Sequence, residues 1–314
     1  MRTLETRLAQ ARELSFAHHG KRIGFHLPGM FTVGATRGRY PAVSITGDAC
    51  ALTCDHCRGK LLLPMIKAMT PQSLVEKCLA LEADGHLGVL VSGGCGPDGD
   101  LPWEAFLPAL AAVKATTRLT VSVHSGFVDR DTARGLKAAG VDQALVDVIG
   151  SDDTYRAVYH VDGGLARLAA SLAALTGAGL PVIPHIVCGL HYGELRGEAR
   201  ALDIVAEIDP DLVVILSLMN LPGTPMARVA PPPAEAVAEL LVAARLRLPR
   251  AQMSLGCARP RGGERLETLA VAAGVNRLAL PSDAARQRAA ELGLAVDYRR
   301  TCCSVRHGPT ENPW

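Results

Sequence analysis

The sequence is poor in aromatic residues, carries little net charge and lacks long hydrophobic runs. Only 4% of its 314 residues are aromatic, and 33 Lys and Arg against 31 Asp and Glu give a formal charge of +2. Few aromatic rings and a balanced charge give no basis for nucleic-acid binding or for attraction to an anionic membrane. Because no apolar run reaches the roughly 18 residues that cross a bilayer, we expect no transmembrane helix.

The N-terminal segment also lacks the pattern of a secretory signal. Residues 1–7 are charged and contain no apolar core. We therefore expect a cytoplasmic protein whose nine cysteines do not form a disulfide framework. In a reducing compartment, clustered thiols are more often buried, catalytic or metal-bound. With 48% hydrophobic residues, the chain can bury a sizeable core.

Short apolar runs alternate with longer Ala- and Leu-rich stretches through the middle of the chain. Helix starts are marked by Thr70-Pro71, Asp129 and Ser282. Near-continuous apolar runs are typical of parallel strands that helices cover. Eight strands are predicted, at residues 40–47, 87–94, 119–126, 143–150, 181–189, 212–220, 251–257 and 277–281.

Eight β–α units in succession predict an α/β fold, a (β/α)8 TIM-type barrel in a single domain, with a doubly wound open sheet as the alternative. Residues 1–39 would form an N-terminal extension, residues 40–293 the barrel, and residues 294–314 a C-terminal tail with a cysteine pair. Barrel enzymes carry their chemistry at the C-terminal ends of the strands, so the functional loops are expected at that face.

Three cysteines follow the first predicted strand with the spacing Cys-x3-Cys-x2-Cys. They are Cys50, Cys54 and Cys57. Thiolates this close can hold three irons of a cubane cluster and leave the fourth iron open to a small molecule. The alternatives are a zinc knuckle or three unrelated cysteines. Zinc would need a fourth Cys or His at knuckle spacing, and His56 is poorly placed for that role.

This cysteine motif resembles the signature of radical S-adenosylmethionine (SAM) enzymes. The resemblance implies a 4Fe–4S cluster held by Cys50, Cys54 and Cys57, with SAM chelating the open iron. It also implies that one electron cleaves SAM and produces a radical that abstracts a hydrogen atom from an unactivated carbon. The cofactor supplies the difficult chemistry, and the protein supplies position and a dry cavity.

The same resemblance implies a SAM site built from strand ends. His56 would pack near the adenine, and Gly189 belongs to a glycine-containing motif that runs along it. Asp147, at the end of the fourth strand, would accept hydrogen bonds from the ribose. The segment Ser92-Gly93-Gly94 corresponds to the family motif whose backbone receives the methionine, although Cys95 follows where the family usually has Glu. A simple turn at the glycines and a structural role for Asp147 are the alternatives.

The remaining cysteines suggest a second, auxiliary 4Fe–4S cluster. Cys95 and Cys257 each end a predicted strand, and Cys302 and Cys303 lie in the tail. Sulfur-inserting members of the superfamily use such a cluster as the sulfur donor, so we expect these four cysteines to be ligands, with Cys257, Cys302 and Cys303 acting in catalysis. Adjacent cysteines reach one cluster only through a strained turn. The alternative is an exposed, reducible tail pair.

Three further segments, 147–160, 184–194 and 256–260, resemble the biotin-synthase-like group that includes the two-protein lipoyl synthases. The resemblance implies a lipoyl synthase component that adds sulfur to C6 or C8 of a protein-bound octanoyl chain. The alternatives are a radical SAM enzyme of small-molecule or cofactor biosynthesis without sulfur insertion, and a non-catalytic iron–sulfur or zinc protein.

The resemblance to the lipoyl synthases also implies partners. They are an octanoylated carrier protein or lipoyl domain, a companion radical SAM protein, and a reductant such as ferredoxin or flavodoxin. Four arginines near the predicted catalytic face could contact an acidic carrier: Arg259, Arg261, Arg299 and Arg300.

Overall fold

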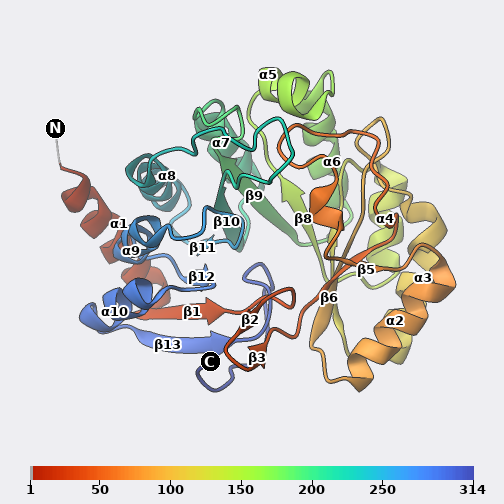
Figure 1. The fold of residues 1–314 in the computed structure, drawn as a ribbon, viewed down its shortest axis with the longest axis horizontal. Coiled ribbons are helices and arrows are strands. Elements are labelled where there is room, and N and C mark those ends of the chain that lie inside the picture. The colour runs from red at the N-terminus through yellow and green to blue at the C-terminus, as the bar shows by residue number, and fades with distance from the viewer. Residues whose placement is uncertain (1–2) are drawn as a thin grey trace.

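A curled parallel sheet of eleven strands organises the computed structural model, which describes residues 3–314 (Figure 1). Eight strands lie side by side in chain order, as a TIM-type barrel requires. A doubly wound sheet would reverse its order, so that alternative is excluded. The eight correspond to the predicted strands: β4 (Ala42–Ser44), β6 (Gly88–Ser92), β7 (Thr120–His124), β8 (Gln143–Asp147), β9 (Val182–Cys188), β10 (Leu212–Ser217), β11 (Gln252–Leu255) and β12 (Arg277–Ala279).

The predicted N-terminal extension and C-terminal tail each add a strand to this sheet. β1 (Arg22–His26) pairs with β12 on one side and with β13 (Ala295–Arg299) on the other. Each strand buries only two apolar side chains against the helices, Ile23 and Phe25 in β1 and Val296 and Tyr298 in β13. This alternating pattern is short compared with the long apolar runs of the other strands, so sequence analysis did not predict β1 and β13.

The barrel does not close by strand pairing within the described residues. β13 lies at one edge of the sheet and β5 (Ile66–Lys67) at the other. Residues 27–40 cross the opening between them and include the hairpin of β2 (Thr32–Val33) and β3 (Thr36–Arg37). Arg39 N donates to Arg300 O at 2.6 Å, so backbone bonds outside the ladder connect the two sides.

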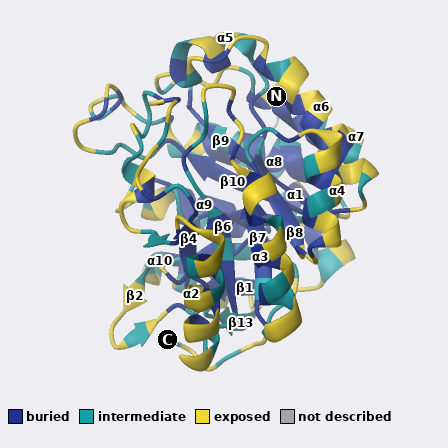
Figure 2. Cartoon of the chain, turned by 90° about the vertical axis from the view of Figure 1, so that its right-hand side faces the viewer, coloured by how far each residue is buried: buried dark blue, intermediate teal, exposed yellow. Residues whose placement is uncertain are grey.

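Helices cover the convex face of the sheet, and their outer sides are exposed while the central strands are largely buried (Figure 2). Thr70, Asp129 and Ser282 cap their helices as predicted, each accepting a hydrogen bond from a backbone N–H in the first turn. No described helix is long and apolar enough to cross a membrane. The helices are α1 (Leu4–His19), η1 (Lys60–Leu62), α2 (Pro71–Ala83), α3 (Trp103–Thr116), α4 (Arg130–Ala138), α5 (Asp152–Thr154), η2 (Tyr155–Tyr159), α6 (Gly164–Gly177), α7 (Glu198–Ile208), α8 (Ala234–Arg247), α9 (Glu264–Ala272) and α10 (Asp283–Glu291).

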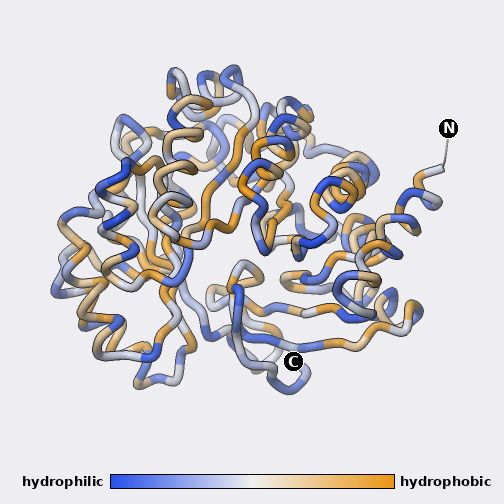
Figure 3. Tube along the Cα trace, turned by 180° about the vertical axis from the view of Figure 1, so that it is seen from behind, coloured by the Kyte–Doolittle hydropathy of each residue, from blue (hydrophilic) through white to orange (hydrophobic). Residues whose placement is uncertain are grey.

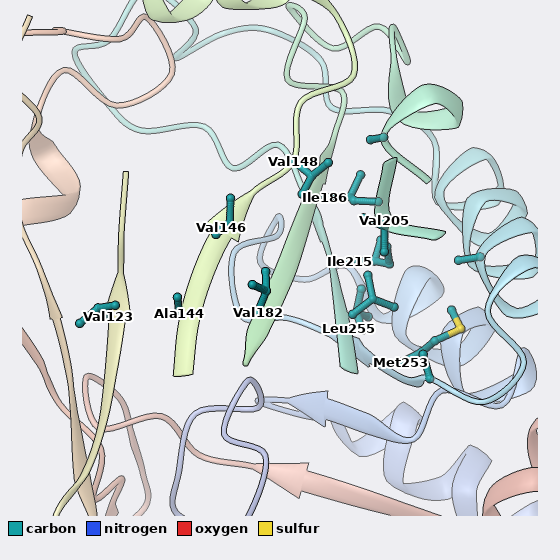
Figure 4. Close-up of a cluster of buried hydrophobic side chains, with 14 of the residues drawn as sticks. Val123, Ala144, Val146, Val148, Val182, Ile186, Val205, Ile215, Met253 and Leu255 are labelled. Atoms are coloured by element: carbon teal, nitrogen blue, oxygen red, sulfur yellow. The ribbon is translucent and has the colours of Figure 1, made fainter. Parts of the chain in front are cut away.

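The main hydrophobic core lies between the strands and these helices. Hydrophobic stretches of the chain trace gather in the middle of the molecule (Figure 3). Alternate strand residues point to opposite faces of a sheet, so one set of side chains meets the helices. Figure 4 shows this set, which includes Val146, Ile186, Ile215 and Leu255, together with Val205 of α7.

The opposite, concave face of the sheet is filled by the C-terminal tail. Cys303 is only 2% exposed and belongs to a second apolar cluster with inward residues of neighbouring strands, among them Leu145, Ile183 and Val214. The Gln143 side chain donates to Ser304 O at 2.8 Å and accepts from Arg306 N at 3.1 Å. The predicted tail is therefore an internal part of the fold.

We expect Gln143→Ala to release this tail from the sheet. The change leaves a buried carbonyl and an amide without partners, which costs about 1–3 kcal/mol for each group. Hydrogen exchange of the segment 301–306, followed by mass spectrometry, should become markedly faster. Gln72→Ala, in the exposed part of α2, is the matched control and should leave exchange in the tail unchanged. Equal protection in both variants would contradict this role of Gln143.

Candidate active site

The loop that carries Cys50, Cys54 and Cys57 follows β4 at the C-terminal edge of the sheet, where functional groups of barrel enzymes lie. The Cys54 thiol donates a hydrogen bond to Cys57, and this bond lowers the pKa of Cys57 to about 4 while the pKa of Cys54 is raised. His56 also favours the thiolate of Cys57 through a hydrogen bond. Because the thiolate is the metal-binding form of cysteine, the loop is prepared to bind metal.

The chemistry of these donors fits an iron–sulfur cluster. Among residues 3–314, no three His, Cys, Asp or Glu side chains converge on a position for a single metal ion. Cys54 is buried, Cys50 and Cys57 are half-buried, and all three belong to one packed cluster around Leu52. Soft thiolates in a loop with this spacing suit a cluster of several irons.

Backbone contacts fix the cysteine loop on its neighbours. Ala51 N donates to Cys95 O at 2.8 Å, and Asp55 N donates to Val158 O at 2.9 Å. The Asp55 carboxylate also accepts a hydrogen bond from Tyr192 Oη at 2.6 Å. The loop is therefore tied to β6, η2 and the segment after β9.

The two glycines at the end of β6 allow the strand to pass directly beneath this loop. A methyl group on Gly94 would lie 2.0 Å from Ala49 O and 2.5 Å from Cys50 Cβ. A methyl group on Gly93 would meet Thr46 Oγ1 at 2.9 Å. Neither contact is possible, so the residue type at these positions is set by close packing against the cysteine loop.

A cavity of about 100 Å³ adjoins the loop and contains four of the predicted site residues, Ser92, Gly93, Cys95 and Asp147. Its other walls are largely apolar and include Leu52, Phe127, Ile149 and Tyr159. His56 lies beside this cavity, with its ring 5.2 Å from the ring of Tyr159. His56 Nδ1 is buried and has no hydrogen-bond partner, so it is free to contact a ligand.

Asp147 forms an ion pair with His124, which sequence analysis did not predict. His124 Nε2 lies 3.5 Å from Asp147 Oδ1, and the His185 ring is 5.9 Å from the His124 ring. Burial alone would raise the pKa of Asp147, but the charge and hydrogen bond of His124 hold it at about 2. Burial and the charge of His124 lower the pKa of His185 to about 4. At neutral pH the site therefore holds an ionised Asp147 and a neutral His185.

Gly189 lies at the end of β9, outside the residues that line this cavity. Its φ of +76° favours glycine, and a methyl group there would lie 2.4 Å from Pro232 Cδ. Gly189 N donates to the Glu198 side chain at 2.9 Å. Glu198, at the start of α7, is thus a residue that fixes the turn after β9. Sequence analysis missed it because the two residues meet only through the folded loop.

The four cysteines expected around a second cluster fall into two groups. Cys95 packs with Cys50, Cys54 and Cys57 around Leu52. Cys257, Cys302 and Cys303 instead lie together on the concave face of the sheet. Ser304 Oγ is 3.1 Å from Cys302 Sγ, and hydrogen bonds led by that of Cys303 lower the pKa of Cys302 to about 6. The structure therefore brings three of the four residues together and places Cys95 at the first cysteine loop.

One of the four arginines expected to meet a carrier is not available for that role. Arg259 is 1% exposed and pairs with Glu267 at 2.7 Å. It also donates to Gly256 O at 2.6 Å, so it supports the loop after β11 from inside. Arg261 stacks over the Phe31 ring, with its guanidinium carbon 4.9 Å from the ring centre.

Comparisons with known proteins agree with this geometry. Residues 44–203 match the family model described as the Radical SAM superfamily. The chain is 26% identical over 283 residues to a biotin synthase of Halorhodospira halophila, covering 83% of this chain and 84% of that protein. It is 28% identical over 284 residues to a biotin synthase of Polaromonas naphthalenivorans, covering 84% and 80% respectively.

Two solved structures share the fold. Methylornithine synthase aligns with a TM-score of 0.65 at 17% identity, covering 96% of this chain and 91% of its own. HydG, a maturase of the FeFe-hydrogenase, aligns with a TM-score of 0.66 at 15% identity, covering 94% and 68%. At these identities the likeness concerns the fold alone.

We expect Gly94→Ala to lose most of the iron that the wild-type protein incorporates. The added methyl group cannot fit below Ala49 and Cys50, so the cysteine loop must move away from β6. Iron content and visible absorbance after anaerobic reconstitution measure the effect. Gly177→Ala, in α6 with no atom within 4 Å of the new methyl group, should load iron normally. Normal loading of Gly94→Ala would show that the loop does not depend on this contact.

Proposed function

The chain belongs to the radical SAM superfamily, and from that premise we propose that it inserts sulfur into an unactivated carbon chain. Membership of the superfamily brings a 4Fe–4S cluster and SAM as cofactors. When bound, they supply the one-electron chemistry that activates a C–H bond. The observation that carries the proposal is the group of three thiols, Cys257, Cys302 and Cys303, on the concave face of the sheet.

These three thiols suit an auxiliary iron–sulfur cluster as the sulfur source. The residues come from β11 and from the tail, and they interact strongly enough to shift one another's pKa. Cys303 is buried, whereas Cys257 and Cys302 are half-buried. A buried cluster shielded from water is a suitable place from which to transfer sulfur to a carbon radical.

The residues around the first cavity have the chemistry to hold SAM. The ionised Asp147 is suited to accept hydrogen bonds from ribose hydroxyls. Gly93 lines the cavity and has no side chain, so its backbone can contact the methionine part of SAM. His56, with its free Nδ1, and Tyr159 offer ring surfaces and a hydrogen-bonding atom near the adenine.

The proposed substrate is a protein-bound octanoyl chain, which would receive sulfur at C6 or C8. Leu90, Val187 and Ala258 are partly exposed apolar residues beside Cys257 and Cys302. They form a wall suited to an alkyl chain that offers no polar group for recognition, so selection would depend on cavity shape. The biotin synthases among the relatives support sulfur insertion, and the octanoyl substrate rests on the sequence resemblance to lipoyl synthases.

The partners proposed with this substrate are an octanoylated carrier protein or lipoyl domain and a companion radical SAM protein for the other insertion. The reductant would be a ferredoxin or flavodoxin. Of the four arginines considered for the carrier, Arg300 pairs with Glu311 and Arg299 with Asp297. These pairs are half-buried, and a carrier would have to replace the carboxylate partner in each of them.

We expect Asp147→Asn to weaken SAM binding about tenfold, the factor that corresponds to one charge-assisted hydrogen bond. The variant keeps the size of the side chain and removes its charge. Equilibrium binding of SAM to the reconstituted protein measures the change. Asp131→Asn, at a 91% exposed side chain, is the matched control and should bind SAM as the wild type does. Equal affinity of all three proteins would remove Asp147 from the SAM site.

The central test counts iron and sulfide in Cys302→Ala and Cys303→Ala after anaerobic reconstitution. We expect about eight irons in the wild type and about four in the variants, since each cluster holds four. Both variants should still cleave SAM and should fail to add sulfur to an octanoyl-lysyl peptide, as mass spectrometry with and without the companion protein would show. Cys78→Ala, at a buried thiol within α2, is the control.

Other outcomes separate the alternatives. A thiolated peptide from both tail variants would contradict the role of the tail cysteines. About four irons in the wild type, with SAM cleavage, would indicate a radical SAM enzyme without sulfur insertion. A protein that binds zinc alone would contradict the whole proposal.

A further inference from the structure

A second cavity lies along β1 and β13 and beside the first residues of β11 and β12, and no residue of the cysteine loop lines it. Its volume is about 420 Å³, within the range of small-molecule sites. The first residues of β1, β11 and β12 contribute to its wall, and residues 306–308 of the tail complete it. β1 and β13, which both contribute to the lining, run side by side in the sheet (Figure 1).

The cavity is lined by an excess of positive charge. Arg22, Arg277, Arg299 and Arg306 face it, and Asp297 is the only acidic residue among its described lining. The strand period explains the arrangement, because Ile23 and Phe25 point to the helices while Arg22 and the alternate residues point inward. Arg306 pairs with Asp211 and Arg299 with Asp297, so Arg22 and Arg277 are the two guanidinium groups of this wall that no described carboxylate balances.

Arg277 and Arg299 also donate hydrogen bonds to uncharged groups. Arg277 donates to Gln252 Oε1 at 2.7 Å and to the backbone oxygens of Cys303 and Val305. Arg299 donates to Gly308 O. The Arg22 guanidinium has no hydrogen-bond or ion-pair partner among residues 3–314, and Arg22 is exposed at the edge of the cavity. Carbonyl oxygens fix the orientation of the guanidinium groups and leave their charge in place.

A buried ring nitrogen at the same place also lacks a partner. His26 is 1% exposed and lines the cavity, and its Nε2 has no hydrogen bond within the protein. A buried polar atom without a partner is energetically unfavourable, so such atoms usually mark a bound water, ion or ligand. Gly24 keeps the space next to this nitrogen open, since a methyl group there would lie 3.2 Å from it.

We propose that this cavity is a binding site for a small oxyanion, either a phosphate or a carboxylate group of a metabolite. Arg22 is the group free to pair with its oxygens, Arg277 supplies a second charge that no carboxylate balances, and the partnerless ring nitrogen of His26 lies in the same wall. Arginine matches phosphate and carboxylate oxygens with paired N–H groups. The site does not depend on the proposed sulfur insertion.

A bound anion would act on the tail as well. Arg277 lines the cavity and donates to the backbone oxygen of Cys303, and Arg299 lies in the tail two residues before Thr301. An anion that reduces the repulsion among these arginines therefore holds the segment that carries Cys302 and Cys303 more firmly in the sheet.

Calorimetric titration of the full-length protein tests the site, with inorganic phosphate and citrate as separate probes at constant ionic strength in KCl. We expect saturable binding of at least one probe, with one site per chain. Arg22→Gln should weaken binding about tenfold, because one charge-assisted contact is lost. Arg118→Gln removes the same charge at a 98% exposed side chain and should leave binding unchanged.

The pattern of results decides the proposal and the ligand class. Tighter binding of phosphate than of citrate assigns a phosphate-bearing ligand, and the reverse assigns a carboxylate. A higher midpoint of thermal unfolding with the bound probe than with KCl, reduced in Arg22→Gln, supports the site independently. Equal weakening in both variants would mean non-specific attraction to surface charge, and no saturable binding of either probe would also overturn the proposal.

Discussion

The concave face of the curled sheet is covered by the chain's own C-terminal tail, and the remaining architecture depends on this contact. Residues 301–305 lie among the inward side chains of β8, β9 and β10, where water cannot satisfy their backbone. Gln143 and Arg277 bind the oxygens of Ser304 and Cys303 and so make this burial possible. An unpaired buried carbonyl would cost more than the apolar contacts of a small Cys side chain return.

The same tail gives the two ends of the sheet different chemistry. Towards the carboxyl ends of the strands it presents thiols, which lie near Cys257 after β11. Towards the amino ends it closes a cavity with residues 306–308 and draws arginines into the wall to hold its carbonyl groups. The positive cavity and the group of three thiols are therefore two consequences of one anchoring arrangement, because Arg277 contacts both.

Sequence analysis predicted the parts of the fold that depend on local pattern. The eight central strands are near-continuous apolar runs, and the spacing of Cys50, Cys54 and Cys57 identifies their loop without any tertiary contact. The strands β1 and β13 were missed because each has only two apolar residues on its buried side. The pairing of His124 with Asp147 depends on the register of β7 and β8, and the burial of Arg259 depends on Glu267 of α9. Neither of these two contacts can be predicted from the spacing of the residues along the chain.

The division of the cysteines bears on how the proposed sulfur insertion would be arranged. Cys95 packs with the first cysteine loop, whereas Cys257, Cys302 and Cys303 form a separate group on the concave face. His124 pairs with Asp147 in the first cavity, and Leu90 and Val187 pack against the cluster that contains Cys303. In the proposed reaction the same substrate carbon must meet the hydrogen-abstracting group and then the sulfur donor, so the separation of these two groups sets how far the substrate moves between the two steps.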